Sequence, residues 1–164
     1  MFDAFLEIDG IPGESTDGKH KNQIELLSYS HGLIQTSSGS VSSGGGRGAE
    51  RCDHGSFSCV KNLDKATPKL AEAICKGTHI PKVTLRLCRA AGDKTQYMEY
   101  AMENVIVDSL SYGGSSGGES ALPVETVSFN YGKITWKYTE TDHKTGAAKG
   151  DVQAGWDLEA NAPA

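Results

Sequence analysis

Residues 52–59, CDHGSFSC, carry side chains whose types could do chemistry. Cys52 and Cys59 bracket His54, and Asp53 lies directly before that histidine. Thiolates, imidazoles and carboxylates are the protein ligands that Zn²⁺ binds, and a thiol beside a base can act as a nucleophile. Four interpretations are therefore open: a metal site, part of a disulfide framework, a catalytic thiol, or a strand that contains two cysteines.

A metal site is difficult to build if residues 53–60 form a strand. Successive side chains of a strand alternate between its faces, so Cys52 and His54 would share one face while Cys59 points to the other. Gly55 permits a bulge that could bring the three together. The spacing also differs from the usual C-x₂₋₄-C pattern. These points weaken the metal site without excluding it, and we expect no bound metal.

A catalytic role for Cys52 and His54 rests only on their closeness in sequence, because such a pair also needs a thiol of low pKa in a concave site. The sequence contains no G-x-S-x-G elbow, no P-loop and no H-E-x-x-H motif. The GGSSGG run at residues 113–118 lacks the lysine and the following helix of a phosphate-binding loop. The sequence therefore predicts no catalytic residue, no cofactor and no enzyme.

Charge and composition restrict the partners. The chain has 16 Lys and Arg against 21 Asp and Glu, a formal charge of −5, which argues against nonspecific binding to nucleic acid or anionic lipid. The start, MFDAFLEIDG, lacks the basic and apolar regions of a secretory signal, and no window approaches the roughly 20 apolar residues of a membrane helix. We expect cytoplasmic synthesis, no membrane insertion and, in that reducing compartment, four free cysteines.

Most of the chain has strand patterning. Apolar and polar residues alternate over residues 2–8, with Phe5 as the exception, and residues 22–36 are typical of a second long strand. Further strands are indicated over residues 83–88, 95–112, 121–140 and from 152 onward. About seven strands and one helix predict a mainly β fold, a compact antiparallel β-barrel or sandwich with one short flanking helix.

The helix is predicted over residues 67–76. Thr67 could cap it, Pro68 suits its first position, and Gly77 could end it. A helix this short cannot organise 164 residues, so we expect it to flank or plug a sheet.

Residues 36–50, TSSGSVSSGGGRGAE, are almost wholly Ser and Gly. Such a segment buries too little apolar surface to order itself, so we expect it to be mobile in an isolated subunit. A flexible loop or linker explains this composition. However, unstructured segments of this length inside a compact domain are often functional, which makes it a candidate contact surface.

Several long segments resemble one family in register. They are MFDAFLEIDGIPGES, LLSYSHGLIQTSSG, the Gly-rich loop, HGSFSCVKNLDKATPKLAEAICKGTHIPKVTLRLCRAAG and VDSLSYGGSSGGESALPVETVSFNYGKITWKY. Together they resemble the Hcp family, the haemolysin-coregulated proteins of the bacterial type VI secretion system. Cys52 and Cys59 are not part of that resemblance, and we interpret them as reduced packing or surface thiols.

The resemblance implies a single β-barrel domain over residues 1–164 that assembles as a hexameric ring. Rings of this family stack into a hollow tube inside a contractile sheath, carry a VgrG-type spike at the tip and can hold effectors. The resemblance implies no enzymatic core. It also implies that the protein leaves the cell through this apparatus, without a signal peptide.

The resemblance also assigns site residues. It places residues 37–50 in a loop that projects towards the next ring, with the stacking contacts drawn from Ser37, Ser38, Gly39, Ser40, Val41, Ser42, Gly44, Gly45, Gly46 and Arg47. The SYSHG segment resembles the part that lines the lumen, so Ser28 and Ser30 are candidates for effector contact. A solvated strand face explains the same two serines.

Two other functions remain open from the residues. One is a secreted binding or effector module that does not polymerise. The other is a metal- or thiol-dependent enzyme centred on Cys52 and His54.

Overall fold

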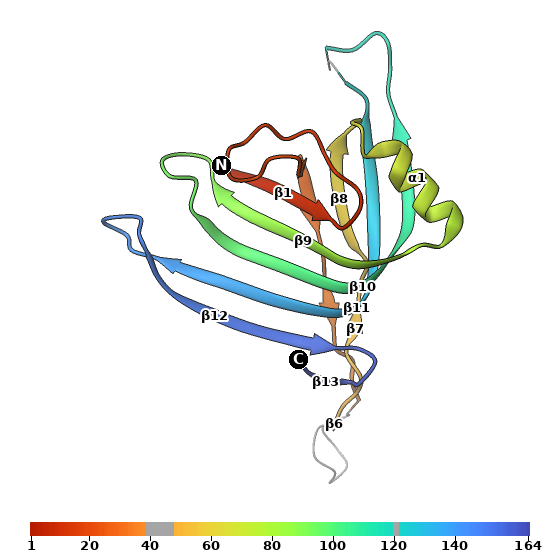
Figure 1. Cartoon of the computed structure of the whole chain (residues 1–164). Helices are drawn as coiled ribbons and strands as arrows, with labels where there is room; N and C mark the ends of the chain where they lie inside the picture. Colours follow the sequence, from red (N-terminus) through yellow and green to blue (C-terminus); the bar gives the residue numbers. More distant parts are fainter. Residues whose placement is uncertain (39–47, 120–121) are drawn as a thin grey trace.

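The computed structural model describes residues 1–38, 48–119 and 122–164 (Figure 1). Its elements are β1 (Phe2–Ile8), β2 (Ile24–Glu25), β3 (Ser28–Ser30), β4 (Leu33–Ile34), β5 (Ser37–Ser38), β6 (Gly48–Ala49), β7 (Asp53–His54), β8 (Phe57–Asn62), α1 (Thr67–Lys76), β9 (His79–Arg89), β10 (Gln96–Gly113), β11 (Val124–Thr141), β12 (Ala148–Asp157) and β13 (Ala162–Pro163). The predicted mainly β fold with one short helix is confirmed.

The strands form an antiparallel barrel. The main sheet has the order β13-β12-β11-β10-β9-β1-β2, and β8 pairs with the first part of β11, over Val124–Phe129. The barrel closes because β2 pairs with β1 while β3, a few residues later, pairs with β8. The second part of β11 pairs with β12 instead, so this end of the sheet extends beyond the barrel, as Figure 1 shows.

Residues 22–36 are not one long strand, as the sequence pattern indicated, but three short ones. β2 pairs with β1, β3 pairs with β8, and β4 pairs with β7. The change of partner falls at Leu26 and Leu27, whose N–H groups donate to Ala4 O and Val60 O respectively. The segment alternates like a strand because it is extended throughout, but its neighbours change along its length.

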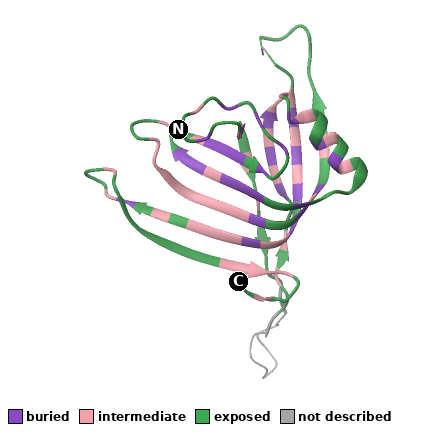
Figure 2. Cartoon of the chain, in the orientation of Figure 1, coloured by how far each residue is buried: buried purple, intermediate pink, exposed green. Residues whose placement is uncertain are grey.

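The core lies inside the barrel, where buried and less buried residues alternate along the strands (Figure 2). Phe57, Phe129, Leu6, Leu85, Met102 and Ile134 are fully buried. Phe5, the exception in the pattern of β1, is buried on the other face, where its ring stacks on His20 at a centroid distance of 4.3 Å. The loop after β1 therefore covers what would otherwise be a solvated face.

Helix α1 covers one end of the barrel and buries Leu70 and Ala73. Its predicted bounds, and its end at Gly77 in the left-handed conformation (φ 61°), are confirmed. The predicted cap is wrong: Ala66 occupies that position, and the Thr67 hydroxyl is instead within hydrogen-bond distance of Glu125. No helix in the described ranges has the length and apolar character needed to cross a membrane.

An ion pair is buried beneath this helix. Lys61 on β8 and Glu125 on β11 are paired, and both side chains are 0% exposed. The Lys61 ammonium also lies 2.8 Å from the Asp64 carboxylate and donates to the carbonyl oxygen of Asn62 at 3.0 Å. The second carboxylate oxygen of Glu125 is buried without a hydrogen-bond partner in the described residues. The two charges therefore pair with each other, but the described residues do not provide hydrogen bonds to both oxygens of the Glu125 carboxylate.

Candidate functional site

A two-stranded ribbon leaves one end of the barrel, at the bottom of Figure 1. It consists of residues 33–38 and 48–54: β4 pairs with β7, and β5 pairs with β6. Between these two pairings, the Gln35 side chain donates to Glu50 O at 2.6 Å. The described ends of the Ser/Gly segment are thus paired backbone, whereas its mobility in an isolated subunit stays a prediction. Near the barrel, Leu33 and Ile34 are exposed (46% and 66%).

The predicted stacking residues divide into two groups. Ser37 and Ser38 form β5, opposite Ala49 and Gly48. The others lie outside the described residues: Gly39, Ser40, Val41, Ser42, Gly44, Gly45, Gly46 and Arg47. The structure therefore places the start of the predicted contact segment at the far end of the ribbon.

The two predicted lumen residues lie on β3. Ser28 and Ser30 are exposed and pair with Val60 and Ser58 of β8. Ser30 also lies at the rim of a broad open depression, whose other lining residues are Tyr29, His31, Gly32, Leu33, Met98, Tyr100 and Trp136. Sequence reasoning found the serines but missed these neighbours, because β10 and β11 supply Met98, Tyr100 and Trp136 from distant parts of the chain.

The CDHGSFSC stretch contributes to two elements. Asp53 and His54 form β7, and β8 begins at Phe57, with the Gly55 N–H bonded to Gly32 O at 3.0 Å between them. Cys59 is buried in the core, whereas Cys52 lies half-buried on the ribbon. The four cysteines are free thiols, as predicted. In the described part of the chain, no three His, Cys, Asp or Glu side chains are grouped to hold a metal.

Replacing Cys52 with serine is expected to change the free energy of unfolding by less than about 0.5 kcal/mol, because the thiol makes only a long contact, 3.8 Å, with the carbonyl oxygen of Asp53. Chemical denaturation and elemental analysis for zinc, on the wild-type and variant proteins, check this expectation. A stoichiometric metal that is lost on substitution would instead support the metal site.

His54 has a different partner from those that the sequence suggested. The Tyr131 hydroxyl oxygen lies 2.8 Å from His54 Nδ1 and 2.8 Å from His31 Nε2. The ring of His31 also stacks on Phe57 at a centroid distance of 5.0 Å. We call this arrangement of His31, Tyr131 and His54 the relay. Sequence reasoning missed it because Tyr131 is 100 residues from His31 and 77 residues from His54. The relay joins both strands at the base of the ribbon to β11.

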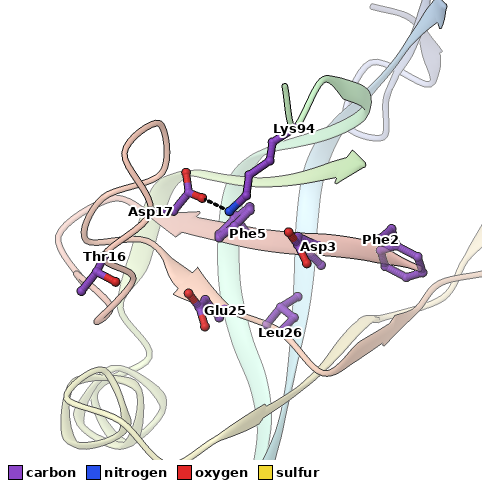
Figure 3. Close-up of a pocket in the computed structure, with 9 residues that line it drawn as sticks. Phe2, Asp3, Phe5, Thr16, Asp17, Glu25, Leu26 and Lys94 are labelled. Carbon is purple, nitrogen blue, oxygen red and sulfur yellow. Dashed lines mark hydrogen bonds and ion pairs between the residues drawn. The ribbon is translucent and has the colours of Figure 1, made fainter. Parts of the chain in front are cut away.

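An acidic cavity of about 270 Å³ lies away from the ribbon, near the N-terminus (Figure 3). Asp3, Asp17 and Glu25 line it, and Lys94 reaches across to pair with Asp17 at 2.5 Å. The hydrogen bond from Lys94 lowers the pKa of Asp17 to about 2. That carboxylate is ionised at neutral pH and is a poor general acid or base there.

Comparisons with known proteins agree with this geometry. The family model described as "Type VI secretion system effector, Hcp" matches residues 5–138. The chain is 35% identical to Protein hcp1 of Pseudomonas aeruginosa over 163 residues, covering 99% of this chain and 98% of that protein. It is 28% identical to the Major exported protein of the same organism, covering 82% of this chain and 78% of that protein.

Solved structures give the same result. One described as a type six secretion system protein matches with a TM-score of 0.92 and 34% identity, and each chain is covered completely. A distant likeness, with a TM-score of 0.51 and 11% identity over 81% of this chain and 89% of the other, is to the baseplate of an anti-feeding prophage and concerns the fold alone. The chain therefore belongs to the Hcp family of the type VI secretion system, whose members are secreted tube and effector-carrier proteins and not enzymes.

Proposed function

We propose that six copies of this chain form a ring and that rings stack head to tail into a hollow tube. In this proposal residues 1–164 act as one domain, the tube carries effectors, a VgrG-type spike lies at its tip, and a contractile sheath expels it. The chain is then made in the cytoplasm and leaves through the apparatus without a signal peptide. The observation that carries the proposal is a closed barrel with a ribbon leaving one end and an open sheet edge on one side.

The open edge is β12. Only the end of this strand has a neighbour on its outer side, since β13 pairs with Trp156 and Asp157. On the side of Ala148 to Ala154 that faces away from β11, no described strand pairs with it, and Val152 is 70% exposed. An exposed edge of this length can pair with another chain, so native proteins usually cover it. A neighbouring subunit in the ring would cover this edge.

The ribbon supports the stacking part of the proposal. Its far end, at Ser38 and Gly48, is where residues 39–47 join it in sequence, and a segment rich in glycine permits close approach of backbones. The stacking contacts in this proposal are Ser37, Ser38, Gly39, Ser40, Val41, Ser42, Gly44, Gly45, Gly46 and Arg47. Ser28 and Ser30, which are both exposed, are the proposed effector contacts, and Ser30 lines the aromatic depression.

Electron microscopy of the purified protein tests the ring. The proposal predicts six-fold rings, and native mass spectrometry should give six times the mass of one chain. A monodisperse monomer across micromolar concentrations would contradict the proposal and would favour a binding module that does not polymerise.

Deleting Gly44–Arg47 is expected to leave the ring intact and to weaken stacking by at least about tenfold, because removal of four residues shortens the reach of the segment. Sedimentation velocity separates single rings from stacks and measures this loss. Arg47→Ala, which removes one proposed contact but keeps the length, distinguishes the loss of that contact from the loss of reach. A deletion variant that fell apart into monomers would show that the segment belongs to the ring interface instead.

A further inference from the structure

Tyr131 is placed to sense the protonation of two imidazoles. It lies on β11 and is only 4% exposed, and its single hydroxyl contacts His31, between β3 and β4, and His54, on β7. Both histidines belong to the segments from which the ribbon starts. The hydroxyl is thus the polar contact that these two histidines share with the barrel.

The number of protons in this relay is limited. A phenol donates one hydrogen bond, and a neutral imidazole has one nitrogen that donates and one that accepts. With both rings neutral, the Tyr131 hydroxyl can donate to one histidine while it accepts an N–H from the other. One protonated ring is tolerated, because its N–H can be the donor. If both rings are protonated, the hydroxyl loses its acceptor and two cations face each other across one oxygen.

The surroundings do not offset such charges. Phe57 packs against His31, and the hydroxyls of Tyr29 and Tyr100, whose rings also pack against Phe57, lie 3.3 Å apart. Among the described residues, no carboxylate is hydrogen-bonded to either imidazole. Of the neighbouring carboxylates, that of Asp53 is exposed and that of Asp108 accepts from Ser56 at 2.5 Å.

We propose that His31, Tyr131 and His54 form a proton-sensitive clamp, which holds the base of the ribbon against the barrel while at least one imidazole is neutral and releases it when both are protonated. The ribbon then becomes freer to move at acid pH, although the barrel remains folded. A consequence for ring stacking rests on the function proposed above; the clamp itself does not.

The electrostatics give the direction and the pH range. Burial lowers the pKa of both histidines below the ordinary value of 6.5, and the nearby His54 lowers that of His31 further. The folded state therefore binds fewer protons than the unfolded state when the pH falls below about 6.5. The stabilisation from the neutral rings is complete above that pH and is lost as the pH falls through the lowered values.

Hydrogen exchange at pH 7.5 and pH 5.0 tests the clamp in the full chain. We expect the protection factors of the amides of residues 31–34 and 52–55, corrected for intrinsic exchange, to fall by at least about tenfold at pH 5.0, the factor that one pKa unit supplies. The amides of β9 serve as the internal reference and should keep their protection. Unchanged protection of the ribbon base at both pH values would overturn the clamp.

Two variants separate the clamp from general acid sensitivity. His54→Gln keeps a hydrogen-bonding side chain that does not titrate, so its protection should change less than about twofold between the two pH values. His143→Gln, in an exposed loop, is the matched control and should respond like the wild-type protein. If His54→Gln responded like the wild type, the clamp would be wrong.

Tyr131→Phe provides a second measurement that does not depend on pH titration. It removes the hydroxyl and keeps the ring, so the ribbon base should be poorly protected at both pH values. Wild-type protection in this variant would contradict the clamp.

Sedimentation of the same samples measures stacking separately. Exchange that responds to acid in a protein that never forms rings would refute the proposed function and leave the clamp standing. If rings form but the exchange does not respond to acid, the clamp is refuted and the proposed function stands.

Discussion

Replacing Lys61 with methionine is expected to lower the free energy of unfolding by about 3–5 kcal/mol, the usual cost of removing one partner of a buried ion pair. Methionine keeps much of the apolar length of lysine but leaves the Glu125 carboxylate, which is 0% exposed, without its cation. Urea denaturation at pH 7 measures the loss. Lys65→Met is the matched control, since Lys65 is exposed and should change the free energy by less than about 0.5 kcal/mol.

The double variant Lys61→Met with Glu125→Leu decides what the ion pair contributes. Because one carboxylate oxygen of Glu125 has no hydrogen-bond partner among residues 1–38, 48–119 and 122–164, these residues compensate incompletely for the water that both groups lost on folding. Removing both charges should therefore restore the stability to within about 1 kcal/mol of the wild-type value or above it. If the double variant instead remained as unstable as Lys61→Met, the ion pair would be a net stabilising feature and this interpretation of its energetics would be wrong.

These two residues also show where sequence reasoning about the fold fails. Local signals were sufficient for the helix: Pro68 and Gly77 predicted its bounds because first-turn prolines and left-handed glycines act on their own backbone. Lys61 and Glu125 lie on the core face by strand alternation, in line with Phe57 and Phe129, but their charges argue for a solvated face. They are buried because they pair with each other and contact Asp64 and Thr67 at the start of α1, and strand periodicity does not reveal such partners.

The candidate site shows the same limit. The exposure of Ser28 and Ser30 was predictable from two small polar residues in alternation within one strand. The contacts of Tyr131 with His31 and His54 were not predictable. The sequence singled out His54 as a neighbour of Cys52, whereas Tyr131 belongs to a different predicted strand. The position of β7, which carries His54, depends on its pairing with β4. The sequence therefore singled out His54 but associated it with Cys52, whereas its hydrogen-bond partner in the structure is Tyr131.

Replacing Phe57 with alanine is expected to cost about 3–5 kcal/mol in the free energy of unfolding, the range for truncating a buried phenylalanine. Phe57 is 0% exposed and begins β8, where its ring lies 5.9 Å from Tyr29 and 5.4 Å from Tyr100. It therefore connects β3, β8 and β10 at the point where the barrel closes. Phe2→Ala, at a ring that is 45% exposed, is the matched control and should cost far less. Equal losses in the two variants would contradict this role.

The same variant links the core to the ribbon. Phe57 supports the ring of His31, so its truncation should leave that imidazole more hydrated and better able to accept a proton. The pKa of His31, followed by NMR titration, should then rise towards the ordinary value, and the base of the ribbon should lose protection at a higher pH than in the wild-type protein. A shift of the His31 titration in Phe57→Ala but not in Phe2→Ala would show that burial by this one aromatic ring sets the pH at which the clamp opens. If the His31 titration stayed in place while the barrel lost stability, the proton response would have to arise from the histidine pair alone.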